Sequence, residues 1–246
     1  MTGIYDNNDF FQAYAKMSRS QQGLEGAGEW HQLRPLLPPL KDIHMLDLGC
    51  GYGWHCRYAA DCGASSIVGI DQSQRMIEEA RLRNAHPRIQ YQLCDLEQYA
   101  YPENTFDLVL SSLVLHYVED LSGIFHQVYQ TLKDHGIFVF SIEHPVFTSG
   151  VHQEWIRDSD GNILYWPVDR YFEPGPRETV FLGKTVTKQH HTLTQILMGL
   201  LQAGFQLQAV EEAQPDPKML HLEGMTDELR RPMMLLVRAV KEQGNP

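Results

Sequence analysis

Two acidic residues and a run of glycines near the start of the chain are of the types that hold a nucleotide. Gly49, Gly51 and Gly53 alternate directly after an apolar run that ends at Leu48. Glycines let a ligand approach the backbone, and the helical pattern that follows offers unpaired N–H groups at its start. Asp71 closes a second apolar run about 20 residues further on, a spacing typical of a carboxylate that binds ribose hydroxyls.

The details of this turn distinguish between two kinds of ribose-containing cofactor. A dinucleotide site needs a third small residue where this sequence has Trp54. Asp47 stands shortly before the first glycine, and its charge would repel a pyrophosphate but attract an ammonium or sulfonium group. The turn therefore favours a cationic amino-acid nucleoside, and an NAD(P)-binding oxidoreductase stays open as an alternative.

The stretch D-L-G-C-G-Y-G from Asp47 to Gly53, followed by Gly-Ile-Asp71, resembles motif I and the acidic loop of class I S-adenosylmethionine (SAM)-dependent methyltransferases, with a type 11-like methyltransferase domain. The resemblance implies an α/β, Rossmann-like fold with a seven-stranded, mostly parallel sheet and helices on both faces. Its last strand would be antiparallel and inserted between its neighbours. It also implies an enzyme that uses SAM and releases S-adenosylhomocysteine. A SAM-binding regulatory module without turnover is the other alternative.

The resemblance also assigns roles in binding the methyl donor. Asp95 would contact the adenine amino group and Leu96 would add a backbone contact, although Asp95 has a turn cap as its alternative role. Tyr14 and Arg19 lie in an extension that folds over the cofactor in the resembled enzymes; otherwise Tyr14 is core packing and Arg19 a surface charge. The residues expected to bind the donor are Tyr14, Arg19, Asp47, Gly49, Cys50, Gly51, Trp54, Asp71, Gln72, Met76, Asp95, Leu96 and Ser111.

A repeated strand and helix pattern must position these residues. Apolar runs predict parallel strands that end at the same sheet edge as the glycine turn. The strands expected in the core are 45–48, 67–70, 89–93, 106–112 and 137–142, and the last two are 205–210 and 233–240. Amphipathic periodicity predicts a helix over 121–132, ended by Gly136, and a second helix that begins at a capping box of Thr192 and Gln195.

The pattern divides the chain into four segments. We expect an N-terminal helical cap over 1–42, a SAM-binding core over 43–145, an insertion over 146–190, and a C-terminal helix and strands over 191–246. The insertion lacks helical periodicity, alternates like a strand near Thr179–Val186, and is too long for a simple connection. We interpret it as a lid that shapes the acceptor pocket, with a dimerisation arm as the alternative. The protein is expected to be a monomer or homodimer.

Methyl transfer depends mainly on positioning, and some acceptors also need a base to take a proton. His144 and Glu143 follow the fifth strand at the ligand-facing edge, and His190 lies between the insertion and the next helix. These three residues are the expected catalytic groups, although a structural role is the alternative for each histidine. In the insertion, Trp166, Asp169 and Tyr171 are expected to contact the substrate.

Aromatic side chains near the turn have a further expected role. Trp54, Tyr14 and Trp166 are candidates to shield the sulfonium by cation–π contact. Core packing is the alternative for each of them.

Composition narrows the range of partners. The chain has 246 residues, of which 43% are hydrophobic, enough for one α/β domain with an elaboration. Its 20 basic and 31 acidic residues give a net charge of −11, which opposes binding to a phosphate backbone. After Ser111 the chain also lacks the Asn/Asp-Pro-Pro-Tyr of nucleic-acid amino-methylating enzymes. A small-molecule acceptor O, N or C atom, without nucleic acid, is therefore expected.

Other sequence features concern location and metals. No apolar stretch approaches the ~20 residues that span a bilayer, and the N-terminus is polar and acidic. The cysteines form no C-x-x-C pair; they are Cys50, Cys56, Cys62 and Cys94. The histidines lack a metal-ligand spacing, since His190 and His191 are adjacent. We therefore expect a cytoplasmic protein with no membrane partner and no metal.

Overall fold

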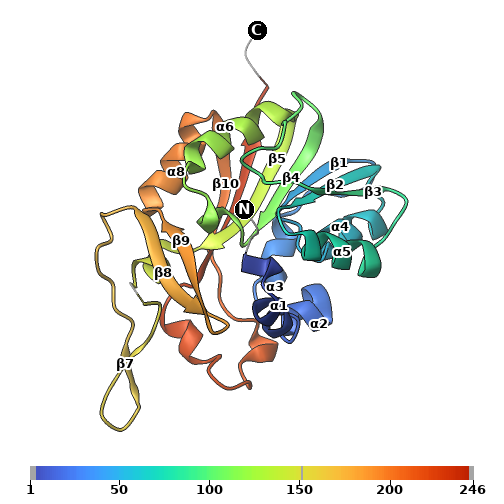
Figure 1. The fold of residues 1–246 in the computed structure, drawn as a ribbon. Helices are drawn as coiled ribbons and strands as arrows, with labels where there is room; N and C mark the ends of the chain where they lie inside the picture. Colours follow the sequence, from blue (N-terminus) through green and yellow to red (C-terminus); the bar gives the residue numbers. More distant parts are fainter. Residues whose placement is uncertain (1–3, 151, 244–246) are drawn as a thin grey trace.

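A single seven-stranded sheet forms the centre of the molecule (Figure 1). The computed structural model describes residues 4–150 and 152–243. The strands are β1 (His44–Leu48), β2 (Ser66–Asp71), β3 (Ile89–Leu93), β4 (Phe106–Ser112), β5 (Leu132–Glu143), β10 (Phe205–Glu212) and β11 (Met234–Lys241), in the order β10-β11-β5-β4-β1-β2-β3. β11 is antiparallel to both neighbours, and the pairings among β1 to β5 are parallel. The predicted fold class is confirmed.

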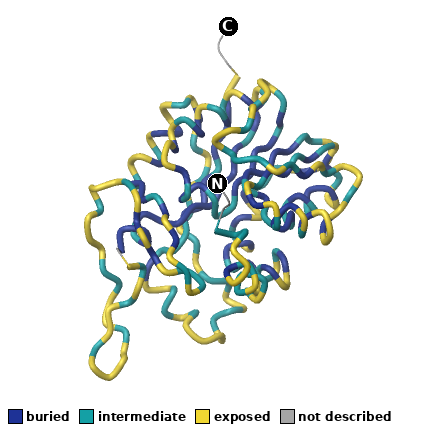
Figure 2. The backbone as a smooth tube through the Cα atoms, viewed as in Figure 1, coloured by how far each residue is buried: buried dark blue, intermediate teal, exposed yellow. Residues whose placement is uncertain are grey.

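Two layers of helices cover the sheet, because both faces of its strands are apolar. Leu46 and Phe138 pack with α6 and α8 on one face, whereas Met45 and Leu108 pack with α3, α4 and α5 on the other. The strands are accordingly the most buried part of the chain (Figure 2). The helices are α3 (Trp30–Leu33), α4 (Trp54–Asp61), α5 (Gln74–Arg83), α6 (Leu121–Thr131) and α8 (Leu193–Gln202).

The N-terminal segment is helical, as its periodicity predicts, and folds back toward the carboxyl ends of the strands (Figure 1). Asp6 Oδ1 accepts a hydrogen bond from Ser73 Oγ at 2.7 Å, at the start of α5. The Tyr5 ring meets the Tyr14 ring with centroids 5.2 Å apart. Its elements are η1 (Ile4–Asp6), α1 (Asn8–Tyr14), α2 (Ser18–Gln22), η2 (Gly23–Gly26) and η3 (Arg34–Leu36).

Residues 146–190 contain a short helix that the sequence did not predict. α7 (Pro145–Ser149) begins where His144 Nδ1 accepts the Val146 N–H at 3.0 Å, with proline at the first helical position. Two hairpins lie further along this segment. They pair β6 (Ile156–Arg157) with β7 (Ile163–Tyr165), and β8 (Gly175–Phe181) with β9 (Lys184–His190). The strand-like alternation predicted near Thr179–Val186 lies in the second hairpin.

The prediction for the fifth strand and the helix before it was wrong at their junction. α6 ends at Thr131 rather than near Gly136, because Leu132 already pairs with Phe106 in the parallel ladder. The capping box of Thr192 and Gln195 at the start of α8 is present. The short helices elsewhere are η4 (Leu115–Tyr117), η5 (Pro217–Met219) and η6 (Asp227–Arg230).

A helix that crosses a membrane needs about 20 predominantly apolar residues. No helix in residues 4–150 and 152–243 is both long enough and apolar enough to do so.

Candidate functional site

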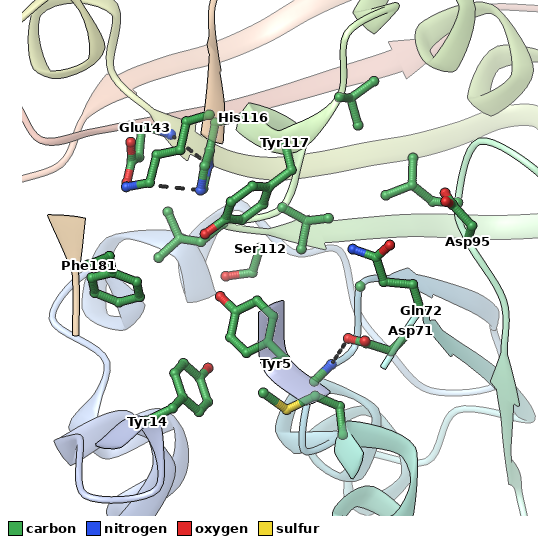
Figure 3. A pocket seen from close by; sticks show the side chains of 18 of the residues that line it. Tyr5, Tyr14, Asp71, Gln72, Asp95, Ser112, His116, Tyr117, Glu143 and Phe181 are labelled. Atoms are coloured by element: carbon green, nitrogen blue, oxygen red, sulfur yellow. Dashed lines mark hydrogen bonds and ion pairs between the residues drawn. The ribbon is translucent and has the colours of Figure 1, made fainter. Parts of the chain in front are cut away.

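A cavity opens at the carboxyl ends of the parallel strands, where the chain leaves β1, β2, β4 and β5 (Figure 3). Ligands collect at this edge in open α/β sheets, because the connections diverge there. Asp71, Gln72 and Asp95 lie at one side of the cavity. Glu143 and Phe181 lie at the opposite side. We call the first side the donor end and the second the acceptor end.

Asp71 at the tip of β2 is fixed by two backbone groups. Its Oδ2 accepts the Gly51 N–H at 3.0 Å and its Oδ1 accepts the Ser73 N–H at 2.8 Å. Burial raises the pKa of Asp71 to about 6, although these two hydrogen bonds oppose the shift. The carboxyl group is thus held between the glycine turn and the start of α5, and it lines the cavity.

Gly49 and Gly51 line the same end for different reasons. Both have positive φ, at 70° and 52°, which favours glycine over residues with a Cβ. A Cβ at Gly49 would lie 2.3 Å from Val114 Cγ2, whereas a Cβ at Gly51 would meet nothing within 4 Å. Packing against Val114 therefore requires glycine at position 49. At Gly51 the absence of a side chain leaves the backbone accessible from the cavity.

Most of the other residues predicted to bind the donor also line the cavity. Gln72, Met76, Asp95 and Leu96 line the cavity. Asp95 Oδ1 also accepts the Glu97 N–H at 3.0 Å, so the turn-capping alternative is met at the same time. Arg19 lines it as well, and Tyr14 lines the cavity on the side of Phe181 (Figure 3).

A smaller hollow adjoins the glycine turn and is lined by Cys50, Trp54 and Arg19. Arg19 forms an ion pair with the buried Glu29, with 2.5 Å between Nη2 and Oε1. Ser20 also lines the hollow. Among the described residues, Ser20 Oγ and Trp54 Nε1 are buried polar atoms without a hydrogen-bond partner. Such atoms fit a polar ligand group, because an unpartnered buried donor is costly.

Two residues of the predicted donor set do not line either cavity. Asp47 points into the α4 layer, where its Oδ2 accepts from Cys56 Sγ at 3.2 Å, and burial raises the pKa of Asp47 to about 7. Ser111 is fully buried and donates to the Leu48 carbonyl at 3.2 Å. Side chains alternate along a strand, so the next residue, Ser112, lines the cavity instead.

The acceptor end contains a buried ion pair. Lys188 Nζ on β9 donates to Glu143 Oε1 on β5 at 2.5 Å, and both side chains are less than a tenth exposed. Gln153 donates to the other carboxylate oxygen at 3.0 Å. Burial acts to raise the pKa of Glu143, but the Lys188 ammonium and the hydrogen bonds from Lys188 and Gln153 oppose it, and the pKa is lowered. Glu143 therefore lines the cavity as a carboxylate that already has partners.

The structure places the two predicted base candidates away from the cavity lining. His144 serves as the cap of α7, and its Nε2 lies 3.0 Å from Glu212 Oε1. His190 is fully buried, with Nδ1 bonded to Thr148 Oγ1 at 2.7 Å and Nε2 to the Tyr171 carbonyl at 2.9 Å. Both ring nitrogens of His190 are thus in use, and its contacts indicate a structural role.

The predicted substrate contacts in the insertion also lie outside the cavity lining. Trp166 stacks on Phe147 and donates to the Val146 carbonyl at 3.1 Å. The Tyr171 hydroxyl accepts the Leu193 N–H at 3.1 Å, and Asp169 is exposed. Packing within the insertion, which periodicity does not reveal, directs these side chains elsewhere.

Sequence reasoning missed several residues that line the acceptor end. Tyr5 comes from η1, His116 and Tyr117 from η4, and Phe181 from the β8–β9 hairpin (Figure 3). Lys188, on the same hairpin, lines the cavity as well. His116 and Tyr117 stand directly after the fourth strand in the sequence, and that position was the available signal. Nothing in the local pattern of the other three indicates that they meet.

Within 4–150 and 152–243, no group of three or more His, Cys, Asp or Glu side chains is arranged to hold a metal ion.

The sheet order, the glycine turn and two strand-tip acids around one cavity define a nucleoside-binding, Rossmann-like site. The methyltransferase domain family matches residues 46–140. A crystal structure from Mesorhizobium loti, an S-adenosylmethionine-dependent methyltransferase, is 42% identical with a TM-score of 0.82, over 89% of this chain and 100% of its own. A Listeria monocytogenes protein assigned to the same enzymes is 47% identical with a TM-score of 0.86, over 90% and 100%.

A full-length relative extends this similarity. An uncharacterized protein from Haemophilus influenzae is 30% identical over 97% of this chain and 96% of its own length. The chain belongs to the SAM-dependent methyltransferases, and its cofactor is SAM. The oxidoreductase alternative is thereby set aside.

Proposed function

We propose that the protein transfers a methyl group from SAM to a small-molecule acceptor bound at the acceptor end of the cavity. The observation that carries this proposal is the enclosure of that end by segments far apart in the sequence. Tyr5 and Tyr14 reach it from the N-terminal segment, and Phe181 and Lys188 reach it from the β8–β9 hairpin. An acceptor held there must fit among these side chains.

Contacts between the two covering segments support a closed acceptor end. The Phe10 ring meets the Phe181 ring with centroids 5.8 Å apart, and Phe10 is fully buried. Lys184 pairs with Asp9 at 3.2 Å across the same junction. A closed cover excludes water and orients a small acceptor, whereas a polymer would need an open groove.

At the donor end, we assign the ribose hydroxyls to Asp71 and the adenine to Asp95 and Leu96. Both carboxylates face the cavity, and a carboxylate accepts hydrogen bonds from hydroxyl and amino groups. The polar amino-acid end of the donor fits Arg19, Ser20 and Trp54, because two of these side chains have unpartnered buried polar atoms.

The bound SAM supplies a methyl carbon activated by its sulfonium. This chain contributes position: the strand tips fix the donor, and the covering segments fix the acceptor. Positioning of this kind can supply about 7–11 kcal/mol. No metal enters this proposal.

The test is transfer of labelled methyl from SAM into two fractions of a bacterial lysate. One fraction is the ultrafiltrate, which contains metabolites, and the other is the retained protein and nucleic acid. We expect label in the ultrafiltrate. Label confined to retained protein or RNA would contradict a small-molecule acceptor, and the absence of label from both fractions would contradict turnover.

Tyr14→Ala tests the enclosure itself. The Tyr14 ring meets the rings of Tyr5 and Tyr52 edge-on, with centroids 5.2 and 5.9 Å apart. Removal of the Tyr14 ring should therefore open the cover. We expect slower transfer into the ultrafiltrate. Tyr129→Ala is the matched control, because Tyr129 packs on Phe205 at the far side of the sheet.

A further inference from the structure

The polar groups at the acceptor end offer hydrogen-bond donors. An ammonium group carries three N–H donors. Lys188 Nζ uses one on Glu143 Oε1 at 2.5 Å and another on Gln153 Oε1 at 3.1 Å. One donor stays available within the described residues, and Lys188 lines the cavity. A positive N–H donor in a buried position favours an oxygen atom with negative charge.

His116 presents a donor rather than a base. Its Nδ1 accepts the backbone N–H of Glu143 in a long hydrogen bond of 3.5 Å. The neutral ring therefore carries its proton on Nε2, a tautomer assigned from that bond. Nε2 lies 3.9 Å from Glu143 Oε1, beyond hydrogen-bond distance. Burial lowers the pKa of His116 to about 4, with Lys188 and His191 acting in the same direction and Glu143 against it.

The other titratable groups that line this end are weak bases. Burial raises the pKa of the Tyr5, Tyr14 and Tyr117 hydroxyls, so they stay protonated and can donate. Glu143 accepts hydrogen bonds from Lys188 and Gln153, and this pairing lowers its pKa, so its carboxylate holds a proton weakly. Among the described residues lining the acceptor end, none is therefore a strong base for a neutral acceptor.

We propose that the acceptor atom is an oxygen that arrives already ionised, as in a carboxylate or an acidic enol or phenol, and that Lys188 and His116 Nε2–H hold it. This inference rests on the proposed function and narrows its substrate class. An amine acceptor is disfavoured, because it arrives protonated and would need both a base and a site free of the Lys188 charge.

The step is balanced without a proton transfer. The acceptor oxygen forms a bond to the methyl carbon while the carbon–sulfur bond breaks, and that electron pair stays on sulfur. A negative oxygen and a positive sulfonium become two neutral groups. Exclusion of water favours this reaction, because water stabilises the separated charges more than the neutral products. Lys188 and Glu143 neutralise one another, so the two reacting charges are also balanced within the cavity.

The experiment uses the 246-residue chain, labelled SAM and the ultrafiltrate of a bacterial lysate. Labelled products are divided by the chemistry of the new bond. Alkali releases methanol from a carboxylate methyl ester, hot hydriodic acid releases methyl iodide from an aryl or enol ether, and C-methyl and N-methyl groups resist both under mild conditions. We expect the label to be released by one of the first two treatments.

The outcomes separate this inference from the function on which it rests. Alkali-labile label identifies a carboxylate and supports the inference. Label released only by hydriodic acid identifies an O-methyl ether, and mass spectrometry of the product then decides: an enol or aryl ether supports the inference, whereas the ether of an aliphatic alcohol, whose hydroxyl arrives un-ionised, overturns it. Label that resists both treatments would overturn it and leave the small-molecule methyltransferase intact. If no small molecule is labelled, both the proposed function and the inference are contradicted.

A double variant tests the role of Lys188 without leaving a buried charge alone. In Lys188→Met/Glu143→Gln, we expect labile label to form roughly 10-fold to 150-fold more slowly, which corresponds to a lost hydrogen bond to a charged group. The dissociation constant for SAM should not change. Lys133→Met/Asp107→Asn is the matched control, because that pair, at 2.8 Å, is partly exposed and lies outside the cavity. A normal rate in the first double variant would remove Lys188 from the acceptor site.

Discussion

The donor end and the acceptor end of the cavity are built from different parts of the chain. At the donor end, Gly51 lies in the turn after β1 and Asp71 ends the neighbouring strand β2, and the Gly51 N–H donates to the Asp71 carboxylate at 3.0 Å. At the acceptor end, Lys188 and Glu143 come from β9 and β5 and are joined through their side chains. The first end depends on the sheet, and the second depends on how the insertion packs.

This difference indicates which variants should affect which ligand. The parallel pairing of β1 with β2 brings the glycine turn and Asp71 to the same sheet edge, and neither strand belongs to the insertion. The acceptor end exists only where η1, η4, the end of β5 and the β8–β9 hairpin meet. Substitutions at the acceptor end should therefore alter acceptor use or overall stability while SAM affinity stays the same. Substitutions of the donor-end side chains that face the cavity should alter SAM affinity.

The largest expected effect is on stability at the acceptor end. Lys188→Met leaves the buried Glu143 carboxylate without its cation, and we expect the free energy of unfolding to fall by about 3–5 kcal/mol. Denaturant unfolding measures the change. Adding Glu143→Gln should recover most of it, because the unpaired charge is removed.

A surface ion pair provides the control for this prediction. Lys133 pairs with Asp107, and both side chains are about one-third exposed. Lys133→Met should change stability by only about 0–1 kcal/mol. Equal losses at Lys188 and Lys133 would show that burial does not distinguish the two pairs.

The second comparison lies within the glycine turn. Gly49→Ala combines positive φ with a Cβ 2.3 Å from Val114 Cγ2, and we expect a loss of stability of about 2–4 kcal/mol. Gly51→Ala has the φ strain alone, about 1 kcal/mol, but its methyl group would enter the open cavity. We therefore expect Gly51→Ala to weaken SAM binding more than stability. Thermal unfolding and calorimetric titration distinguish the two losses, and the opposite order would contradict the assignment of the open backbone to the donor.

The third prediction concerns Asp71. Asp71→Asn removes a charged acceptor from the proposed ribose contact, so SAM affinity should fall by about 1.5–3 kcal/mol. Titration calorimetry measures the affinity, and Asp61→Asn serves as the control because Asp61 is exposed and pairs with Arg57. Unchanged affinity in Asp71→Asn would remove this carboxylate from the donor site.

The donor end could be predicted from the sequence because its parts follow one another along the chain. The turn, Asp71 and Asp95 each come directly after an apolar run, and parallel strands bring such ends to one edge. Errors of one residue remained, because a continuous apolar run does not show which side chains of a strand point toward the cavity. Ser111 was predicted in place of Ser112, and Asp47 lies behind the turn with Cys56.

The acceptor end could not be predicted in the same way, because long-range packing decides it. His144 and His190 were chosen for their positions near the sheet edge, but local capping and Thr148 use their ring nitrogens. Lys188 alternates with exposed residues on an ordinary hairpin strand. No periodicity indicates that it meets Glu143, which is 45 residues earlier.

The smallest expected effect is a pH dependence confined to the donor end. Because the pKa of Asp71 is about 6, the carboxyl is mostly protonated at about pH 5 and mostly ionised at about pH 7. Ribose hydroxyls donate more strongly to the ionised form, so SAM affinity should rise with pH through this range, by less than about tenfold. Calorimetric titration across it measures the change. Asp71→Asn should abolish the rise, whereas Asp47→Asn should retain it, because Asp47 does not line the cavity although its pKa is about 7. A rise that survives in Asp71→Asn but disappears in Asp47→Asn would show that the buried carboxyl behind the turn controls donor binding.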